Sequence, residues 1–288
     1  MPRRDRVLHG EGSEVATEVP TAPFTVLPRD PRPGALAGRA LVYWLTVYRR
    51  TWLGSAISSF LAPVLYLGAM GFGLGALVNR SGGGLGGVPY VDFVAPGLLA
   101  ATAMQTGTGE ATYPVMGAVK WQRQYHAMLA GPLGTVDVVL GHVAFIVLRV
   151  VLACAAFTAV AAALGALPSP LAVVGALVAV LCGAAHVPAV MAFSARQEND
   201  ANFSLLFRFG LIPMFLFAGT FFPVTQLPGW LQRIAWATPL WHGTSAVRQL
   251  CLGTPDWPGI TAHCAYLLLW VAAGLALAFR TYRNRLVA

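Results

Sequence analysis

The sequence predicts an all-α polytopic membrane protein with six transmembrane helices, an N-terminal interfacial helix, and extracytoplasmic re-entrant helices before the last span. Two observations argue against a soluble fold. Hydrophobic residues make up 57% of the 288 residues and charged residues only 10%, whereas soluble domains average roughly 45–50% and 25%. Several stretches also lack ionisable side chains for longer than the roughly 20 residues that a helix needs to cross a bilayer.

The segment before the first span is predicted to stay outside the membrane core. Residues 1–34 contain charges and prolines but no apolar stretch, which favours a disordered cytoplasmic tail. Residues 35–53 follow a helical period, with Arg39 and Arg50 on one face and rings such as Trp44 on the other. This pattern predicts an amphipathic helix lying in the cytoplasmic interface. A plain anchor flanking the first span is the alternative.

The six spans follow from the apolar stretches and their interruptions. Residues 54–78 contain no ionisable side chain over 25 positions. Arg149 and Arg196 are separated by 46 residues without Asp, Glu, Lys or Arg, and Pro168 and Pro170 divide this stretch because proline cannot continue a helix. One transmembrane domain over residues 54–285 is expected. Its spans are placed at residues 54–78, 91–119, 138–167, 170–195, 202–222 and 257–279.

Residues 223–253, between the last two spans, are too apolar for a solvated loop. Pro223, Pro228, Pro239 and Gly243 interrupt any single helix there. Non-helical backbone at membrane depth is tolerated only where protein covers it or water reaches it. A re-entrant pair of short helices is therefore predicted.

The distribution of basic residues predicts the topology. An even number of spans places both termini on one side, and 14 of the 19 Lys and Arg residues fall on that side. Only Arg80, Arg233 and Arg248 fall on the other side, while Arg149 and Arg208 lie inside spans. Basic loops remain in the cytoplasm, so both termini are predicted to be cytoplasmic. The net charge of +8 is thus mainly an orientation signal.

Residues 120–131 connect the second and third spans and combine charge with large apolar groups. A docking surface for a cytoplasmic partner is favoured over a simple connecting loop, which would usually be more polar. Two cations are too few for nucleic-acid binding, so no nucleic-acid partner is expected. The expected docking residues are Lys120, Trp121, Arg123, Tyr125, His126 and Met128.

Two charges inside the predicted spans need an explanation, because ionisable groups are costly in hydrocarbon. Glu110 precedes Lys120 by ten residues and Arg149 follows Asp137 by twelve, which places them at depths of ~15 and ~18 Å at about 1.5 Å per residue. They are predicted to form a structural ion pair between spans two and three. A role in substrate binding or proton transfer is the alternative.

The sequence contains no catalytic or metal-binding constellation. Its six histidines are scattered without an HExxH spacing, and its four cysteines form no CxxC pair. A P-loop is absent, since the only lysine, Lys120, is followed by Trp121. We therefore predict no metal site, no cofactor bound by this chain, and no ATP hydrolysis by this chain alone.

The sequence resembles the permease subunit of ABC-2 type exporters, and within them the nodulation-type lipo-oligosaccharide and antibiotic-resistance permeases. Single pieces are weak motifs, but their order and spacing over residues 35–285 are fairly specific. Residues 104–110 depart from the family pattern, because Gly107 and Gly109 are expected to loosen that helix. The pieces that carry the resemblance are residues 95–100, 123 and 128–133, 138–142, 218–231, 238–240 and 246–248.

The resemblance implies partners and a mechanism. Two permease chains would pair, as a homodimer or with a paralogue, in the bacterial inner membrane among its lipids. Each would dock to a separate nucleotide-binding subunit, present in two copies, that binds ATP and Mg and drives the conformational change. Residues 120–131 would contain the coupling helix, with Arg39, Arg49 and Arg50 near the same contact.

The expected activity is export of an amphipathic molecule, such as a lipid-linked saccharide, a lipid or an apolar antibiotic, through a cavity between two protomers. The competing hypothesis is a non-transport protein, either a membrane scaffold or an intramembrane enzyme using Glu110, Arg149 and His142. Aromatic residues near the outer mouth are candidates for substrate contact, although core packing explains such residues equally well. These candidates are Phe217, Phe221, Phe222, Trp230, Trp236 and Trp241.

Overall fold

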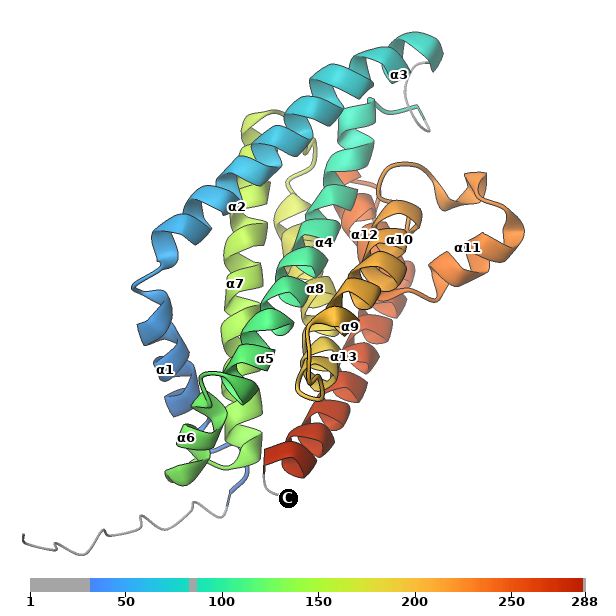
Figure 1. The fold of residues 1–288 in the computed structure, drawn as a ribbon. Helices are drawn as coiled ribbons and strands as arrows, with labels where there is room; N and C mark the ends of the chain where they lie inside the picture. The colour runs from blue at the N-terminus through green and yellow to red at the C-terminus, as the bar shows by residue number, and fades with distance from the viewer. Residues whose placement is uncertain (1–31, 83–86, 287–288) are drawn as a thin grey trace, which may run out of the picture.

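The computed structural model describes residues 32–82 and 87–286, which fold as a bundle of helices (Figure 1). Within these residues, four helices are long and apolar enough to cross a membrane. The predicted N-terminal tail, residues 1–34, lies almost wholly outside the described residues. The four membrane-length helices are Trp52–Arg80, Thr135–Ala163, Ala172–Ser194 and Trp257–Leu286.

The N-terminal half begins with the predicted amphipathic segment, which forms α1. The first membrane-length helix follows as α2, a π-helical segment η1, and α3, and it rises along one edge of the molecule (Figure 1). The bounds are α1 Ala37–Tyr48, α2 Trp52–Leu67, η1 Gly68–Leu74, α3 Gly75–Gly82, α4 Tyr90–Ala111, α5 Tyr113–Lys120 and α6 Gln124–Ala130.

The C-terminal half contains three membrane-length helices and several short ones. The bounds are α7 Thr135–Ala163, α8 Ala172–Ser194, α9 Ala201–Leu205, η2 Leu206–Leu211, α10 Ile212–Phe217, η3 Val224–Gln226, α11 Gly229–Trp236, α12 Pro239–Leu252 and α13 Trp257–Leu286.

Two predicted spans differ from the helices in the structure. The segment 91–119 is divided at Thr112, where φ is −97° and ψ is −100°, and Pro114 at the start of α5 has no amide hydrogen to continue the α4 ladder. The predicted fifth span ends at Phe217 instead of 222. Its η2 turn is π-helical, and Pro213 lies just beyond that turn, where the missing amide disturbs the regular helical bonding.

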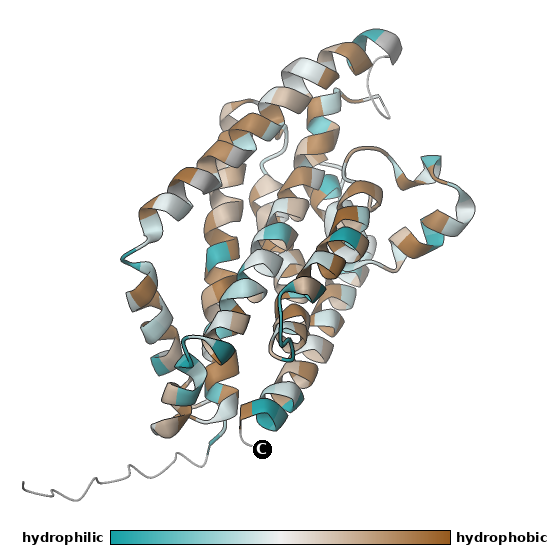
Figure 2. Ribbon diagram, in the orientation of Figure 1, coloured by the Kyte–Doolittle hydropathy of each residue, from teal (hydrophilic) through white to brown (hydrophobic). Residues whose placement is uncertain are grey.

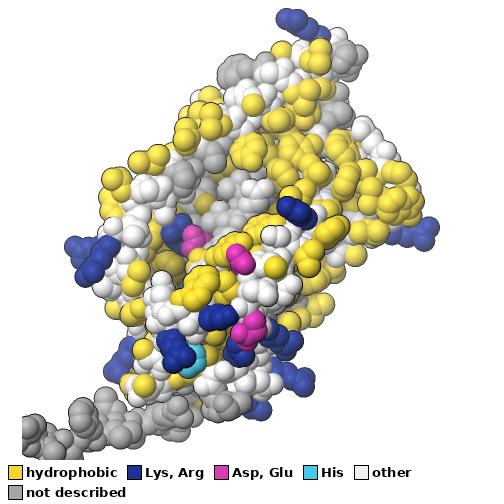
Figure 3. Space-filling view, viewed as in Figure 1, with side chains coloured by type: hydrophobic (Ala, Val, Ile, Leu, Met, Phe, Trp, Pro, Cys, Tyr) yellow, Lys and Arg dark blue, Asp and Glu magenta, His cyan; other side chains and the backbone are white. Residues whose placement is uncertain are grey.

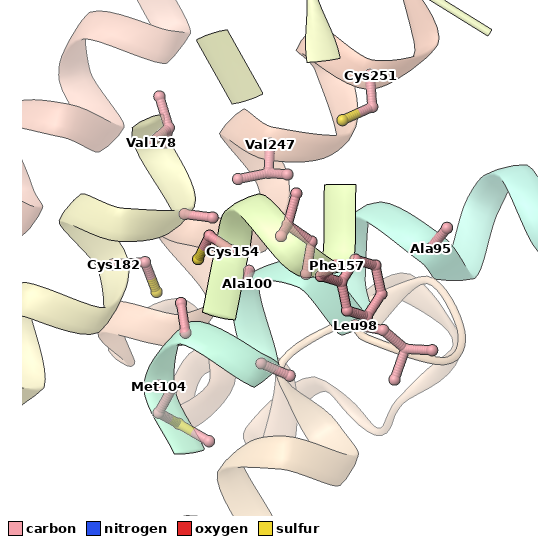
Figure 4. Close-up of a cluster of buried hydrophobic side chains, with 14 of the residues drawn as sticks. Ala95, Leu98, Ala100, Met104, Cys154, Phe157, Val178, Cys182, Val247 and Cys251 are labelled. Carbon is pink, nitrogen blue, oxygen red and sulfur yellow. The ribbon is translucent and has the colours of Figure 1, made fainter. Parts of the chain in front are cut away.

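The core is built around α8, which contacts α4, α7, α12 and α13. Small residues allow the helices to approach closely: a Cβ on Gly183 would lie only 2.7 Å from the carbonyl oxygen of Ala103. Buried side chains from α4, α7, α8 and α12 meet between the helices, including Leu98, Phe157 and Cys182 (Figure 4). Cys251 and Cys264 are free thiols, as are the other cysteines.

The outer surface is apolar over most of its height and charged at one end. Brown, hydrophobic positions recur along α2, α7 and α13 (Figure 2), and Leu268 and Leu269 on α13 are 56% and 65% exposed. Lys and Arg side chains gather at the end where α1, α6 and the last turn of α13 lie (Figure 3). This distribution suits helices surrounded by lipid.

Candidate functional site

The turn between α5 and the short helix α6 is exposed, whereas α6 itself buries one side chain. Helix α6 follows Arg123, a non-glycine residue with a left-handed φ of 50° that turns the chain sharply between α5 and α6. Trp121 is 65% exposed, and Lys120, Arg123 and His126 are exposed as well. Met128 is half-buried. Four of the six predicted docking residues therefore share an accessible surface.

Tyr125, the sixth, points into the protein instead. Its hydroxyl lies 2.5 Å from Nδ1 of His142 on α7 and 3.5 Å from the hydroxyl of Tyr282 on α13. Burial, and then the neighbouring Tyr282, raise the pKa of Tyr125 well above its usual range. The phenol therefore stays neutral and can donate its proton to the imidazole. Tyr125 joins α6 to two membrane-length helices.

Helix α1 is held against the first turns of α7. The amide of Leu36 donates to Oδ1 of Asp137 at 2.9 Å, and Oδ2 of Asp137 accepts from the amide of Gly134, which caps the start of α7. A Cβ on Gly141 would lie 2.4 Å from the Cβ of Ala40, so glycine is needed for this close crossing. Arg39, Arg49 and Arg50 on and just after α1 are exposed.

Aromatic rings continue from this crossing along α1 and α7. Trp44 of α1 stacks on His142, with centroids 3.9 Å apart and planes at 10°, and lies 6.2 Å from Tyr125. Phe145 stacks on Trp44 and meets Tyr48 edge-on. We call the six residues the aromatic cluster: Trp44, Tyr48, Tyr125, His142, Phe145 and Tyr282.

The structure brings the two predicted intramembrane charges together. Arg149 of α7 lies 2.8 Å from Oε1 of Glu110 on α4, and their side chains are 17% and 24% exposed. The other face of the guanidinium packs over the ring of Tyr48 at 4.6 Å, a cation–π arrangement. The ion pair therefore adjoins the aromatic cluster, so contacts run without a gap from Tyr125 on α6 to Glu110.

A polar pocket of about 310 Å³ surrounds this ion pair between α2, α4 and α7. It belongs to a face that is hollowed between α2 and α10, where acidic and basic side chains adjoin (Figure 3). Gly109 has no neighbour within 4 Å where a Cβ would be, whereas Gly107 packs against Val187 and Gly183 of α8. Gly107 therefore allows close packing against α8, and Gly109 leaves open space beside α4. Helix α4 continues through both glycines. The pocket is lined by Ser59, Pro63, Tyr66, Thr102, Gln105, Thr106, Gly109, Glu110, Arg149 and Ala153.

The six aromatic candidates for the outer mouth lie on α10, in the loop before η3, on α11 and on α12. Phe221 packs against Phe215 at 5.0 Å and against the core, as the packing alternative predicts. Trp236 and Trp241 lie 6.3 Å apart. Trp230 on α11 is 64% exposed.

Phe217 and Phe222 have different surroundings. Phe217 ends α10 and lines a small cavity of about 210 Å³ shared with α11. Phe222 follows in the loop before η3 and is half-buried.

Arg248 makes structural contacts that the sequence did not predict, since the sequence indicated only a charge on the outer side. Its Nε donates to the carbonyl of Phe93 at 3.1 Å and its Nη2 to the carbonyl of Gly219 at 2.6 Å. Its guanidinium also lies 3.9 Å over the Phe93 ring. A Cβ on Gly97 would lie 2.7 Å from the carbonyl oxygen of Thr220. Arg248 thus ties α12, α4 and the loop after α10 together.

Two further contacts were not expected from the sequence. His242 of α12 and His263 of α13, counted among scattered histidines, lie with their Nδ1 atoms 2.8 Å apart. At the charged end, Glu198 pairs with Arg285 and with Lys120. In the part of the chain that the structure describes, no three His, Cys, Asp or Glu side chains gather as metal ligands.

Comparison with known proteins decides the family. The sequence profile of the ABC-2 type transporter matches residues 41–252. The chain belongs to the ABC-2 type transporter family. This ABC-2 permease is 34% identical to nodulation protein J of Rhizobium leguminosarum bv. trifolii, over 88% of this chain and 97% of the relative. It is 31% identical to nodulation protein J of Sinorhizobium fredii, over 85% and 94%.

A more distant relative extends the same comparison. The inner membrane transport permease YadH of Escherichia coli (strain K12) is 24% identical over 78% of this chain and 86% of the relative. The ABC-2 chain is therefore an integral membrane protein and the permease subunit of a transporter, and its family implies a partner ATP-binding subunit.

Proposed function

We propose that this ABC-2 permease exports an amphipathic molecule, a lipid-linked saccharide in the first place, from the cytoplasm or the inner leaflet. It works as a homodimer, and each protomer carries one nucleotide-binding subunit that binds ATP and Mg. Six spans cross the membrane, formed by α2–α3, α4–α5, α7, α8, α9–α10 and α13, with α11 and α12 re-entrant from the outside. Both termini are cytoplasmic.

The observation that carries this proposal is the unbroken contact between α6 and the ion pair in the membrane. The exposed side chains of Trp121 and Arg123 offer a surface for the ATPase. The buried Tyr125 on the next helix passes any movement of α6 to His142 and Tyr282. A packed chain of side chains with two arrangements can carry coupling between distant sites. Helix α6 is thereby suited to be the coupling helix.

The hollowed face supports a second copy of the chain as the partner. Its flanking helices present large apolar groups, among them Ile57 and Leu65 on α2 and Phe209 on η2, which are 59%, 61% and 77% exposed. Two such faces opposed would enclose the hollow as a cavity, in line with closed two-fold assembly. The outer-mouth aromatics Phe217, Phe222 and Trp230 would border its exit.

The enzyme alternative receives no support from the positions of its residues. It needs Glu110, Arg149 and His142 to converge on one substrate. The His142 ring is instead held between Trp44 and Tyr125, while Glu110 and Arg149 pair with each other.

The test is co-purification with the partner ATPase, followed by substrate-stimulated ATP hydrolysis. Trp121→Ala combined with Arg123→Ala should reduce association at least tenfold, which corresponds to about 1.4 kcal/mol. Trp230→Ala combined with Arg233→Ala removes an equally exposed pair from α11 and should leave association unchanged. If the ATPase does not associate with the wild-type permease, or if the Trp121→Ala and Arg123→Ala pair has no effect on association, the proposal is wrong.

A further inference from the structure

A further cavity shares Ser59 of α2 with the polar pocket. It is a groove of about 640 Å³ between α1, α2 and α7. Phe60 and Leu152 are 51% and 44% exposed along it, so the groove opens toward the surrounding lipid. Arg49 lies at its end beside α1. The groove is lined by Leu45, Tyr48, Arg49, Trp52, Ser59, Phe60, Leu152, Ala155 and Ala156.

The groove and the polar pocket adjoin beneath α2. Ser59 lines both cavities. Tyr48 lines the groove, and its ring packs against Arg149, which lines the pocket. Within one protomer, an apolar compartment thus continues into a polar one, with α2 covering the junction.

The apolar compartment suits an alkyl chain. Its walls are aliphatic and aromatic apart from Arg49 and Ser59, and burial of methylene groups is favourable in such a groove. Its volume exceeds that of the polar pocket about twofold, so the larger part of a bound molecule would be hydrocarbon.

The polar compartment suits an uncharged head that is rich in hydroxyl groups. Tyr66, Thr102, Gln105 and Thr106 provide both donors and acceptors. The acid and the base that line the pocket neutralise each other at 2.8 Å. Arg149, the cation in this pocket's lining, is already paired with Glu110, and burying an anionic head without an available cation is costly. A sugar hydroxyl can instead bond to either member of the pair without separating them.

We propose that each protomer binds an alkyl glycolipid here, with its chain in the groove and its sugar in the Glu110–Arg149 pocket. This inference rests on the proposed export function. This loading site would hold the molecule within one protomer before the molecule enters the cavity between protomers. Entry runs from the lipid past Leu152 and under α2 at Ser59. Because Arg149 packs on Tyr48 of α1, a molecule bound in the site can change the position of α1.

The site can be tested with a dodecyl maltoside that carries a diazirine at the chain terminus. The full chain with its ATPase is placed in lipid nanodiscs, and the sample is irradiated after the probe is added. The labelled peptides are then identified. Labels should concentrate on α7 near Leu152 and on α2 near Phe60. Leu152→Trp, which fills the groove, should lower this labelling at least fivefold. Leu268→Trp makes the same change on the lipid-facing side of α13 and should not alter it.

The head compartment is tested by variants and by competition. Gln105→Leu together with Thr106→Val keeps the size but removes hydrogen bonds, and should weaken maltoside binding about tenfold. Unlabelled dodecyl maltoside should compete, whereas phosphatidylglycerol should not. Equal competition by phosphatidylglycerol would make the site a phospholipid site and would overturn the proposal.

Two results separate this inference from the proposed function. Labelling spread evenly over lipid-facing helices, or unchanged in Leu152→Trp, overturns the loading site even when ATPase association and basal hydrolysis are normal. Failure of the ATPase to associate in the same samples overturns the export function. Concentrated labelling in that case would still show that the chain binds the glycolipid.

Discussion

Arg149 of α7 forms an ion pair with Glu110 of α4 at 2.8 Å. The same guanidinium rests on Tyr48 of α1 at 4.6 Å. One side chain thereby connects α4 and α7 with α1. Because both charges are largely withdrawn from water, each depends on the other for compensation.

Arg149→Ala should impair assembly, since it leaves Glu110 uncompensated and removes the packing on Tyr48. We expect a loss of about 1–3 kcal/mol, below the range for fully buried pairs because both groups are partly exposed. Adding Glu110→Gln should restore part of the loss. Membrane yield and thermal unfolding in nanodiscs would measure both effects. An Arg149→Ala chain that assembles normally and loses only transport would show that the pair is not structural.

Gly141→Ala should displace α1 from α7, because the new Cβ would lie 2.4 Å from Ala40. Gly38→Ala is the matched control on the exposed face of α1, where a Cβ has no neighbour within 4 Å. It should stabilise α1 by about 0.5–1 kcal/mol. Hydrogen exchange of the α1 amides reports the difference. Equal protection of α1 in both variants would argue against a close crossing that depends on glycine.

Tyr125→Phe should separate docking from coupling. The phenylalanine keeps the packing but removes the hydroxyl that bonds to His142, which costs about 1–3 kcal/mol when the buried partner is left unsatisfied. Association with the ATPase should persist, because Tyr125 is fully buried. Substrate stimulation of hydrolysis should fall severalfold, while basal hydrolysis stays. Full stimulation in this variant would exclude Tyr125 from the transmission of movement.

The charged contact at Glu198 should weaken in acid. The hydrogen bond and the charge of Arg285 lower the pKa of Glu198 below its ordinary value of 4.5, and Lys120 adds to this. A lowered folded-state pKa means that the contact contributes fully above pH 4.5 and is lost as the pH falls through the folded value. Fluorescence from a label at the end of α13 should report increasing motion below about pH 4.5.

Glu198→Gln provides the control for this acid effect. The neutral amide removes the titration, so the label should show high motion already at neutral pH and little change in acid. Because Glu198 is exposed, we expect a local loosening and no global unfolding. An acid transition of the same size in Glu198→Gln would assign the effect to another group.

Much of the helix placement could be predicted because charge and proline are expensive inside a membrane helix. Pro168 and Pro170 separate α7 from α8 as expected, and the last helix begins at Trp257, the predicted position. The break at Thr112 was missed, because Pro114 was read as part of an apolar stretch. The π-helical turn before Pro213 was missed for the same reason: apolar composition carries no information about which backbone amides are bonded.

Part of the candidate site could also be predicted from the sequence, and part could not. Glu110 and Arg149 stand out in the sequence because an ionisable residue in an apolar stretch is costly, and depth arithmetic was enough to suggest their pairing. Nothing in periodicity or spacing could place Tyr125 against His142 or Trp44, or fold Arg248 onto the carbonyls of Phe93 and Gly219. Those contacts join helices that are far apart in the chain.

Composition, charge placement and short motifs were enough to predict a helical membrane protein of the ABC-2 permease type and the positions of its costly charges. Burial in lipid penalises every exposed polar group, so composition and charge placement are strongly constrained. The folded chain was needed to see which helices touch and how α6 connects through Tyr125 to the Glu110–Arg149 pair. It also showed that a groove and a pocket adjoin at Ser59. Such contacts depend on small residues and side-chain shapes at helix crossings, which apolar composition leaves open.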